Sequence, residues 1–281
     1  MKVGDALTQA AADLAEHGVP DARKDASLLV SFATGRDKAF LIAHPESLLP
    51  PEQRSHLENL VARRCQREPL QYILGRQEFF GLEFEVTPDV LIPRPETEVL
   101  VEKAIEILYE VPNSQLCEIG VGSGCISISI LHTVTTTTAL AVDISPAAVE
   151  VANRNAIKHQ VSDRLNIFLS DVFNSVSPQT FDLIVSNPPY VPAPVLETLQ
   201  PEVRDHEPTI ALTSGQLGLD IIERLVTDSP AFLRSRGALL FELGLDQSEQ
   251  VRSMFDTKIW SDIEFLFDLQ GIPRILYAVK R

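Results

Sequence analysis

The chain has 281 residues, of which 44% are hydrophobic and 22% charged, an ordinary globular composition with room for one large or two modest domains. No apolar run approaches the roughly 20 residues that span a bilayer, and the N-terminus lacks the apolar segment of a signal peptide. Cys65, Cys117 and Cys125 have neither metal-site nor disulfide-framework spacing. We therefore expect a cytoplasmic protein with no metal site and no membrane contact.

The net charge of −15 is unevenly placed along the chain. Residues 1–76 hold ten basic and ten acidic residues, so the other 14 basic and 29 acidic residues carry the whole excess. Nucleic-acid binding depends on Lys and Arg that neutralise phosphates, so this acidic part argues against direct contact with nucleic acid. It suits a partner that is basic or neutral on the contacting face.

Residues 1–75 predict a small helical domain, because their apolar spacing is helical and no strand pattern interrupts it. Its functional interpretation is recognition of a protein partner as substrate. Near its end, Arg63, Arg64 and Arg67 either take part in recognition or form a solvated helical face. The expected helices are Val3 to His17, Asp21 to Phe32, Lys38 to Ala43 and Pro51 to Gln66.

Residues 76–95 predict a β-hairpin that links this domain to the rest of the chain. The change of period begins at Gln71 and runs to Ile92, with apolar residues close to alternation and glycine breaks. Two prolines then precede a helix predicted from Thr97 to Tyr109. Between them, Arg94 either contacts a ligand or belongs to a stiff linker.

From Leu116 onward strands and helices alternate, which predicts a doubly wound, mostly parallel sheet in residues 96–281. The first strand leads into the glycine-rich run L-C-E-I-G-V-G-S-G, which ends at Gly124. Glycines at alternate positions allow a tight turn and the close approach of a ligand. The residues that follow, Ile126 to Val134, favour a strand by propensity, but the order of motifs favours a helix, and we predict the helix.

Two further predicted strands end in acidic residues. Leu140 to Ile144 contains Asp143, where a carboxylate suits the two hydroxyls of a ribose, and Leu165 to Asp171 is the next strand. A helix is predicted from Ser145 to about His159, with Ser145 as N-cap. Each acid alone also fits a helix cap or a solvated loop.

The stretch Phe181 to Tyr190, F-D-L-I-V-S-N-P-P-Y, predicts a strand that stops at two prolines. The Asn187 side-chain oxygen and the Pro188 carbonyl can accept from one NH₂ group, and Tyr190 can stack on a planar group. A plain turn is the alternative interpretation of such a Pro-Pro pair.

Val191 to Leu217 predicts a long loop that covers the substrate, because such loops inside compact domains are usually functional. His206 in this loop is either a base or a residue that packs near Tyr190. Beyond the loop we expect a helix over Gly218 to Arg234, a strand over Ala238 to Leu243 with Glu242 at its end, a helix over Ser248 to Phe255, and a terminal hairpin of Ile263 to Leu269 with Ile275 to Lys280.

In order and spacing, these motifs resemble those of class I S-adenosylmethionine-dependent methyltransferases that methylate a planar amide or amino nitrogen. The matching residues are Glu118-x-Gly120-x-Gly122-x-Gly124, Asp143, Asp171 and Asn187 to Tyr190. Outside the motifs, Pro69 to Val101, the stretch E-V-R-D-H-E-P-T-I-A-L-T-S-G-Q-L-G-L-D and the tail L-F-D-L-Q-G-I-P-R closely resemble the release-factor glutamine methyltransferases of the HemK type. The resemblance spans nearly the whole chain.

The resemblance implies a Rossmann-like fold, S-adenosyl-L-methionine as cofactor, and methylation of the glutamine in the Gly-Gly-Gln motif of peptide chain release factors. We expect a monomer. Two positions depart from the pattern: Glu118 replaces the more usual Asp, and Val172 stands where an aromatic residue often packs on adenine. The implied residues are Asn187, Pro188 and Tyr190 for catalysis, Gly120, Val121, Gly122, Ser123, Gly124, Asp143, Asp171 and Asn187 for the cofactor, and Asn187, Pro188, Pro189 and Tyr190 for the substrate.

Two other functions compete with this interpretation. An adenine-N6 methyltransferase of nucleic acid would use the same N-P-P-Y corner on a flipped base, but the acidic charge of the second part of the chain argues against it. A non-catalytic adaptor that binds cofactor and a translation factor would not need an intact corner from Asn187 to Tyr190.

Overall fold

The computed structural model of the chain describes residues 1–268 and 270–281 and divides into two compact units. One short segment that follows Leu199 in the sequence belongs to the first unit, and the chain after it belongs to the second. The end of one predicted strand, Leu269, lies outside the described residues. We name the units the helical unit, Met1–Gly75 with Gln200–His206, and the sheet unit, Arg76–Leu199 with Glu207–Arg281.

The helical unit contains all four helices that the sequence predicts, with ends that differ by at most two residues. Its core consists of buried aliphatic side chains such as Leu14, Leu29 and Leu57. The prediction that the hairpin pattern begins at Gln71 is wrong, because this residue lies in a further short helix. The helices are α1 (Val3–Glu16), α2 (Ala22–Thr34), α3 (Lys38–Ala43), α4 (Pro51–Cys65), α5 (Leu70–Leu74) and α9 (Pro201–His206).

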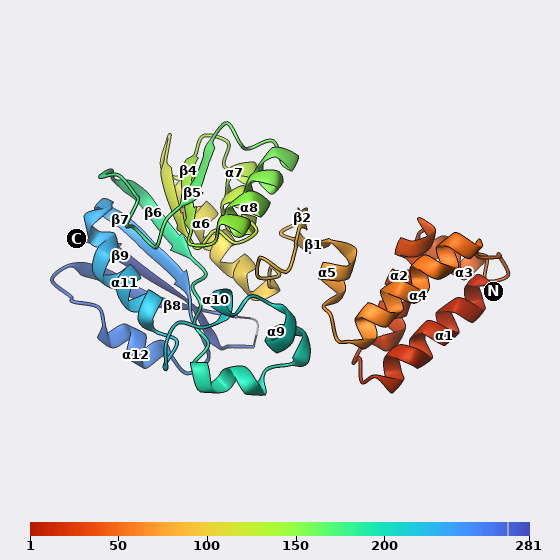
Figure 1. Ribbon diagram of the computed structural model, residues 1–281. Coiled ribbons are helices and arrows are strands. Elements are labelled where there is room, and N and C mark those ends of the chain that lie inside the picture. The colour runs from red at the N-terminus through yellow and green to blue at the C-terminus, as the bar shows by residue number, and fades with distance from the viewer. Residues whose placement is uncertain (269) are drawn as a thin grey trace. The chain divides into compact units, whose positions relative to one another are not determined.

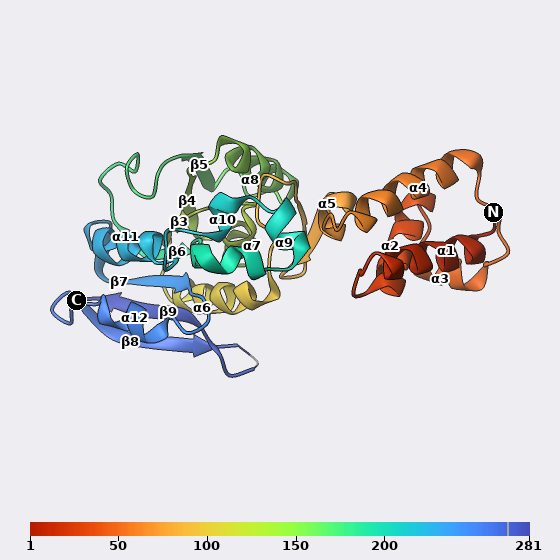
Figure 2. The same cartoon turned by 60° about the horizontal axis from the view of Figure 1, so that its bottom comes forward.

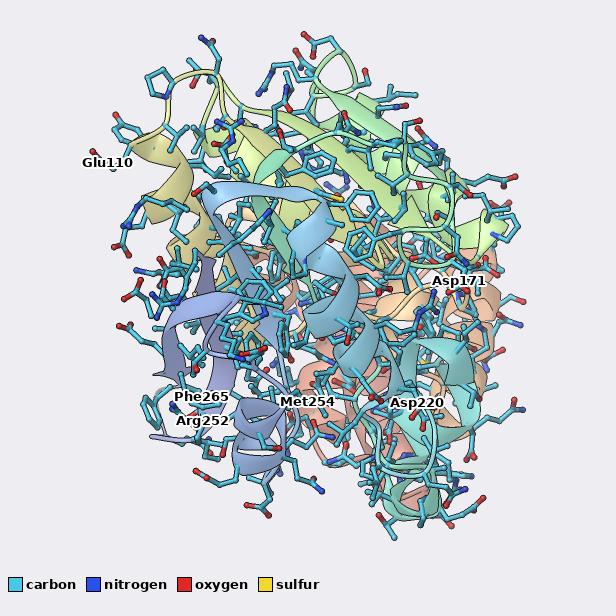
Figure 3. All side chains as sticks on the ribbon, turned by 90° about the vertical axis from the view of Figure 1, so that its left-hand side faces the viewer. Glu110, Asp171, Asp220, Arg252, Met254 and Phe265 are labelled. Atoms are coloured by element: carbon cyan, nitrogen blue, oxygen red, sulfur yellow. The ribbon has the colours of Figure 1, made fainter. Side chains whose placement is uncertain are left out.

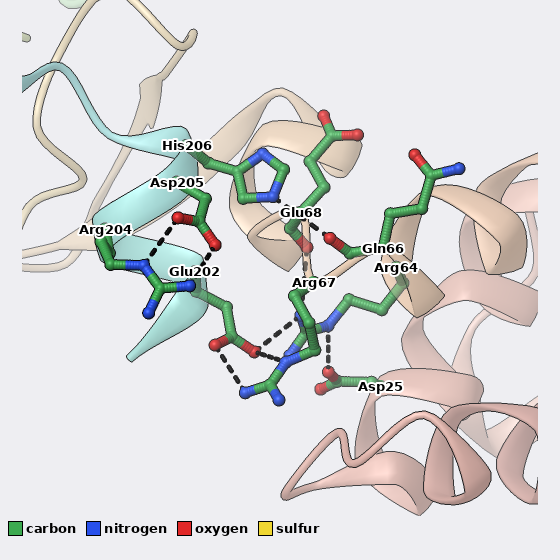
Figure 4. A network of polar contacts seen from close by, with 9 residues as sticks. All are labelled: Asp25, Arg64, Gln66, Arg67, Glu68, Glu202, Arg204, Asp205 and His206. Carbon is green, nitrogen blue, oxygen red and sulfur yellow. Dashed lines mark hydrogen bonds and ion pairs between the residues drawn. The ribbon is translucent and has the colours of Figure 1, made fainter. Parts of the chain in front are cut away.

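Arg64 lies at the centre of an ion-pair network inside the helical unit (Figure 4). Its Nε donates to Asp25 of α2 at 2.8 Å, and its Nη1 donates to Glu202 of α9 at 2.9 Å. Arg67 donates to the same Glu202 carboxylate from Nε and Nη2, both at 2.7 Å. Burial alone would raise the pKa of the Glu202 carboxyl, but the bonds from Arg67 and Arg64 lower it. The segment Gln200–His206 is therefore held to the helical bundle by charged groups.

Replacing Arg64 with alanine is expected to destabilise the helical unit by about 3–5 kcal/mol, because the buried carboxylate of Asp25 then loses its partner. Hydrogen exchange of the α2 and α4 amides in the full chain measures this loss. The control is Arg54→Ala, which breaks the exposed pair with Glu58 and should change stability by less than about 1 kcal/mol. Equal protection in the two variants would contradict the role of the network.

The sheet unit begins with the predicted hairpin and continues into a seven-stranded mixed sheet in the order β5-β4-β3-β6-β7-β9-β8. The first five strands are parallel, and β9 and β8 are antiparallel, which confirms the predicted doubly wound sheet and terminal hairpin. The strands are β1 (Arg76–Phe79), β2 (Leu82–Glu85), β3 (Gln115–Ile119), β4 (Thr138–Asp143), β5 (Leu165–Leu169), β6 (Phe181–Ser186), β7 (Leu233–Glu242), β8 (Trp260–Phe267) and β9 (Pro273–Lys280).

Helices cover both faces of this sheet because alternate strand residues point to opposite sides. Leu116 and Leu183 pack with α6 (Glu98–Tyr109), α7 (Cys125–Thr133) and α8 (Pro146–Lys158) on one face. Cys117 and Ile184 pack with α11 (Asp220–Asp228) and α12 (Ser248–Ser253) on the other. Figures 1 and 2 show the two groups on opposite sides of the strands. In Figure 3, Arg252 of α12 lies by Phe265 of β8, with its guanidinium 4.8 Å from the ring centre.

Two local predictions about helices are confirmed. The segment after Gly124 forms α7 despite its β-branched residues, because burial of its isoleucines against the sheet outweighs propensity. Ser145 caps α8 and accepts a hydrogen bond from Ala148 N at 3.2 Å.

Two predictions in the second half of the chain are wrong. The helix predicted to reach Arg234 ends at Asp228. A 3₁₀ turn with Pro230 in it, η3 (Ser229–Ala231), follows the helix, and β7 starts at Leu233. The loop predicted from Val191 to Leu217 is not irregular. It contains η2 (Ala193–Thr198), α9 and α10 (Thr209–Leu212), which are short helices between prolines.

Candidate active site

A pocket in the sheet unit lies where β3, β4 and β6 end. It encloses about 1150 Å³ of empty space, part of it continuous with solvent. In the sheet, β4 and β5 follow on one side of β3, and the chain then crosses to place β6 on the other side. Such switch points are where open α/β sheets bind ligands. Among the residues predicted as functional, the pocket wall contains Gly120, Val121, Gly122, Ser123, Asp143, Asp171, Asn187 and Pro189.

The glycine run forms the turn between β3 and α7, and Gly120, Gly122 and Gly124 all have positive φ. Gly124 does not line the pocket but is the N-cap residue of α7. A Cβ there would lie 2.7 Å from Ile128 Cδ1 and 3.4 Å from Ala152 Cβ. The φ of +82° at Gly124 lies in the left-handed region, which favours glycine at this position.

Glu118 places a buried carboxyl in the pocket wall. Its Oε2 accepts a hydrogen bond from Ser127 N at 3.0 Å, whereas its Oε1 has no partner among the described residues. Burial raises the pKa of this carboxyl to about 8. A buried acid with one unpaired oxygen is poised for a cationic or donor group of a ligand.

Asp143 connects two turns at the pocket. Its Oδ2 accepts from Gly122 N and its Oδ1 from Ser145 N, both at 2.9 Å. Burial raises the pKa of Asp143, while these backbone bonds oppose the rise. The backbone of Ile144 also bonds to this carboxylate. The prediction that Asp143 takes ribose hydroxyls remains a proposal.

Asp171 also lines the pocket, but its carboxylate is already engaged. Arg224 of α11 donates to Oδ1 at 2.6 Å, and Asn174 donates to Oδ2 at 3.3 Å. The next residue, Val172, lines the pocket with φ of +50°. An aliphatic side chain therefore occupies the place where the family pattern often has an aromatic one.

The corner from Asn187 to Tyr190 is held by a buried hydrogen-bond chain. Asn187 Nδ2 donates to Thr97 Oγ1 at 3.1 Å, and Thr97 Oγ1 donates to Glu242 Oε2 at 2.6 Å. Tyr190 Oη donates to the other oxygen of Glu242 at 2.8 Å. Because the nitrogen of the Asn187 amide faces Thr97, its oxygen is turned away from that residue, and Asn187 lines the pocket. Pro188 and Tyr190 are not in the pocket wall.

The backbone of the same corner is clamped from a different direction. Ser214 Oγ donates to Pro189 O at 2.7 Å, and Gln247 Nε2 donates to Tyr190 O at 2.9 Å and to Leu217 O at 3.0 Å. Both prolines and these bonds restrict the corner, so it is rigid before any ligand arrives.

Arg94 and His206, whose roles the sequence leaves open, lie in different units. Arg94 lines the pocket and forms an ion pair with Glu207, whose side chain is 1% exposed. Burial raises the pKa of Glu207, and the Arg94 guanidinium opposes the rise. His206 belongs to the helical unit, where its Nε2 lies 3.3 Å from Gln66 O.

Sequence reasoning missed Thr97, Ser214 and Gln247, and it noted Glu242 only as a strand end. The signal for Glu242 was present, because an acid at the carboxyl end of a strand beside β6 points to the same sheet edge as Asp143. Thr97 had no such signal, since it lies in a proline-rich turn that equally suits a helix cap.

Residues 1–268 and 270–281 contain no group of three or more His, Cys, Asp and Glu side chains arranged to hold a metal ion. In the same part of the chain, no helix combines the length and the apolar character needed to cross a bilayer.

Two family descriptions match the chain. The family described as "PrmC N-terminal domain" matches residues 5–75, and the family described as "Methyltransferase small domain" matches residues 96–198. The first covers most of the helical unit, and the second covers the pocket strands from β3 to β6.

Curated relatives match over nearly their full length. The release factor glutamine methyltransferase of Geobacter sulfurreducens is 45% identical over 94% of this chain and 91% of its own. The release factor glutamine methyltransferase of Koribacter versatilis is 36% identical over 100% and 99%, respectively. The crystal structure of a methyltransferase from Pyrococcus furiosus has a similar fold, with a TM-score of 0.54, 18% identity, and coverage of 72% of this chain and 90% of its own.

Proposed function

Since the chain belongs to the release factor glutamine methyltransferase family, we propose that its Asn187–Tyr190 corner presents the glutamine of a release factor for methylation. The enzyme transfers a methyl group from S-adenosyl-L-methionine to the side-chain amide nitrogen of the glutamine in the Gly-Gly-Gln motif. The orientation of Asn187 supports this role of the corner. Its amide nitrogen donates to Thr97, so its oxygen is free to accept, and the residue lines the cofactor pocket.

The chemistry requires alignment more than activation. A carboxamide nitrogen is a poor nucleophile because its lone pair is delocalised, and S-adenosylmethionine supplies an activated methyl group on a sulfonium. Holding two reactants in line can supply ~7–11 kcal/mol of barrier reduction. In our proposal, Asn187 Oδ1 and the Pro188 carbonyl accept the two amide hydrogens of the glutamine and stabilise the positive charge that develops on its nitrogen.

No base is required before transfer in this proposal. The methylated nitrogen becomes acidic and releases its proton to water. The hydroxyl of Tyr190 does not supply a base, because burial and the neighbouring Glu242 raise its pKa and keep it protonated. Its proposed role is to anchor the end of the corner.

The cofactor pocket fits a cationic methyl donor. Glu118 offers an unpaired carboxyl oxygen in the wall, and we propose that it faces the charged amino acid part of the cofactor. Gly120, Val121, Gly122 and Ser123 supply the loop that the cofactor contacts, and Asp143 accepts from its ribose. Asp171, already paired with Arg224, presents a fixed acceptor to the base.

Cofactor binding at pH 7 is expected to release close to one proton from Glu118. Its pKa of about 8 means that it is mostly protonated in the free protein, and a bound cation favours the carboxylate. Calorimetry of cofactor binding in buffers of different ionisation enthalpy measures the proton count. The Glu118→Gln variant should release about one proton fewer, and an equal count in both proteins would contradict this placement.

We further propose that the helical unit recognises the release factor and that the enzyme works as a monomer in the cytoplasm, where release factors act. The excess of acidic residues after Arg76 supports a protein substrate over a phosphate backbone. Mass spectrometry of purified release factor after incubation with enzyme and cofactor tests the function, with a gain of about 14 Da on the Gly-Gly-Gln peptide as the expected result. Methyl transfer to duplex DNA but not to release factor would overturn it.

A further inference from the structure

Glu242 is a buried carboxyl that the proposed chemistry does not use. It ends β7, is 1% exposed, and accepts hydrogen bonds on both oxygens, from Thr97 at 2.6 Å and from Tyr190 at 2.8 Å. These two donors come from η1 (Pro95–Thr97) and from the end of the Asn187–Tyr190 corner. The carboxyl of Glu242 therefore bonds both to Thr97, which holds Asn187 at the start of the corner, and to Tyr190 at its end.

The carboxylate of Glu242 sets the donor and acceptor directions in the hydrogen-bonded series Asn187–Thr97–Glu242. When Glu242 is ionised it only accepts, and in that state the single hydroxyl proton of Thr97 points to Glu242. The oxygen of Thr97 is then left as an acceptor, and the group of Asn187 that can donate to it is the amide nitrogen. The bond to Thr97 therefore fixes the orientation of the Asn187 amide, with Nδ2 toward Thr97 and Oδ1 turned away from it.

We propose that Glu242 is a positioning residue for methyl transfer, which fixes the Asn187 amide through Thr97 and the far end of the corner through Tyr190. This inference rests on the proposed function. The orientation of Asn187 decides whether it presents an acceptor or a donor to the glutamine. A reversed Asn187 would present its own NH₂ to the NH₂ of the glutamine, and two donors cannot bind each other.

The surroundings of Glu242 make the acceptor state sensitive to pH. Burial raises the pKa of Glu242, the hydrogen bonds from Thr97 and Tyr190 and the charge of Arg274 oppose the rise, and Glu96 supports it. Cys125 also faces this charge. When the pH falls through the raised pKa, Glu242 gains a proton and can donate to Thr97, which then loses its fixed direction. The rate should therefore fall at a higher pH than an exposed glutamate would impose.

The test compares Thr97→Val, Thr97→Ser and Glu242→Gln with wild-type enzyme in steady-state methylation of a full-length release factor. Thr97→Val keeps the shape but removes the hydroxyl, so kcat should fall by ~10² while the KM for cofactor stays near its wild-type value. Thr97→Ser restores the hydroxyl and should recover most of the rate. Glu242→Gln introduces an NH₂ donor beside Thr97 and removes the titrating carboxyl. Its kcat should therefore fall, and the acid limb of its kcat–pH profile should disappear. Glu110→Gln, at the exposed end of α6 (Figure 3), is the control carboxyl-to-amide change and should behave as wild type.

Three results would overturn the inference: a Thr97→Val rate within about threefold of wild type, a Thr97→Ser rate as low as that of Thr97→Val, or an unchanged acid limb in Glu242→Gln. Thermal unfolding of each variant is measured alongside. If Thr97→Val unfolds at the assay temperature, the pH profile of Glu242→Gln decides. An inactive wild-type enzyme would instead reject the proposed function, so the two failures are distinguishable.

Discussion

Replacing Asn187 with alanine is expected to lower the rate of methyl transfer by about 10²–10³ while cofactor binding persists. In the proposed mechanism this side chain supplies one of two acceptors that hold the glutamine nitrogen and stabilise its developing charge. Its loss leaves Thr97 bonded to Glu242, so the support beneath the corner remains. Single-turnover methylation of a release factor with saturating cofactor measures the chemical step, and calorimetry measures cofactor binding.

A matched control for this variant is Asn153→Ala. Asn153 lies on α8, where its amide nitrogen donates to Val149 O within the same helix, away from the pocket wall. The control should keep the wild-type rate. A loss below about threefold in Asn187→Ala, with cofactor affinity intact, would show that Asn187 does not stabilise the transition state.

Gly218→Ala is expected to displace the backbone of the Asn187–Tyr190 corner and so lower kcat. A Cβ on Gly218 would lie 2.1 Å from Tyr190 O and 2.9 Å from the carbonyl carbon of Val191, and φ is +68°. Because these are backbone atoms, relief requires the corner itself to move. A displacement on the order of 1 Å can reduce a rate by ~10², and the strain and overpacking together should cost roughly 2–5 kcal/mol of stability.

The control for strain alone is Gly81→Ala in the hairpin turn. Gly81 has φ of +71°, but nothing lies within 4 Å of the Cβ position. This variant should lose only about 1–2 kcal/mol of stability and keep its kcat. Steady-state kinetics and thermal unfolding of the two variants separate strain from the clash. Similar kcat values in both would mean that contact with Gly218 does not set the position of the corner.

The pocket residues carried by local patterns could be predicted from the sequence. A strand, a glycine turn and an acid at the next strand end each follow from a few adjacent residues, and parallel order brings Asp143 and Asn187 to one sheet edge. The same reasoning identified α7, where the order of motifs outweighed the preference of Ile126 to Val134 for a strand.

The supports of the site could not be predicted in this way. Thr97 and Glu242 are 145 positions apart, and Asn187 is 90 positions from Thr97, so their contacts depend on the register of packed elements. The early part of β7 was missed for another reason. Its residues Arg234 to Arg236 are exposed and polar, and the pairing with β6 shifts before Ala238, so no alternating pattern marks the strand.

The central claim is that a rigid pair of acceptors holds a neutral carboxamide in line with the methyl donor. A crystal structure with S-adenosylhomocysteine and a release-factor domain that contains Gly-Gly-Gln tests it most directly. We predict that Asn187 Oδ1 and Pro188 O lie about 2.7–3.2 Å from the glutamine nitrogen, with this nitrogen facing the sulfur. A complex in which the glutamine amide reaches the sulfur but neither acceptor would contradict the account.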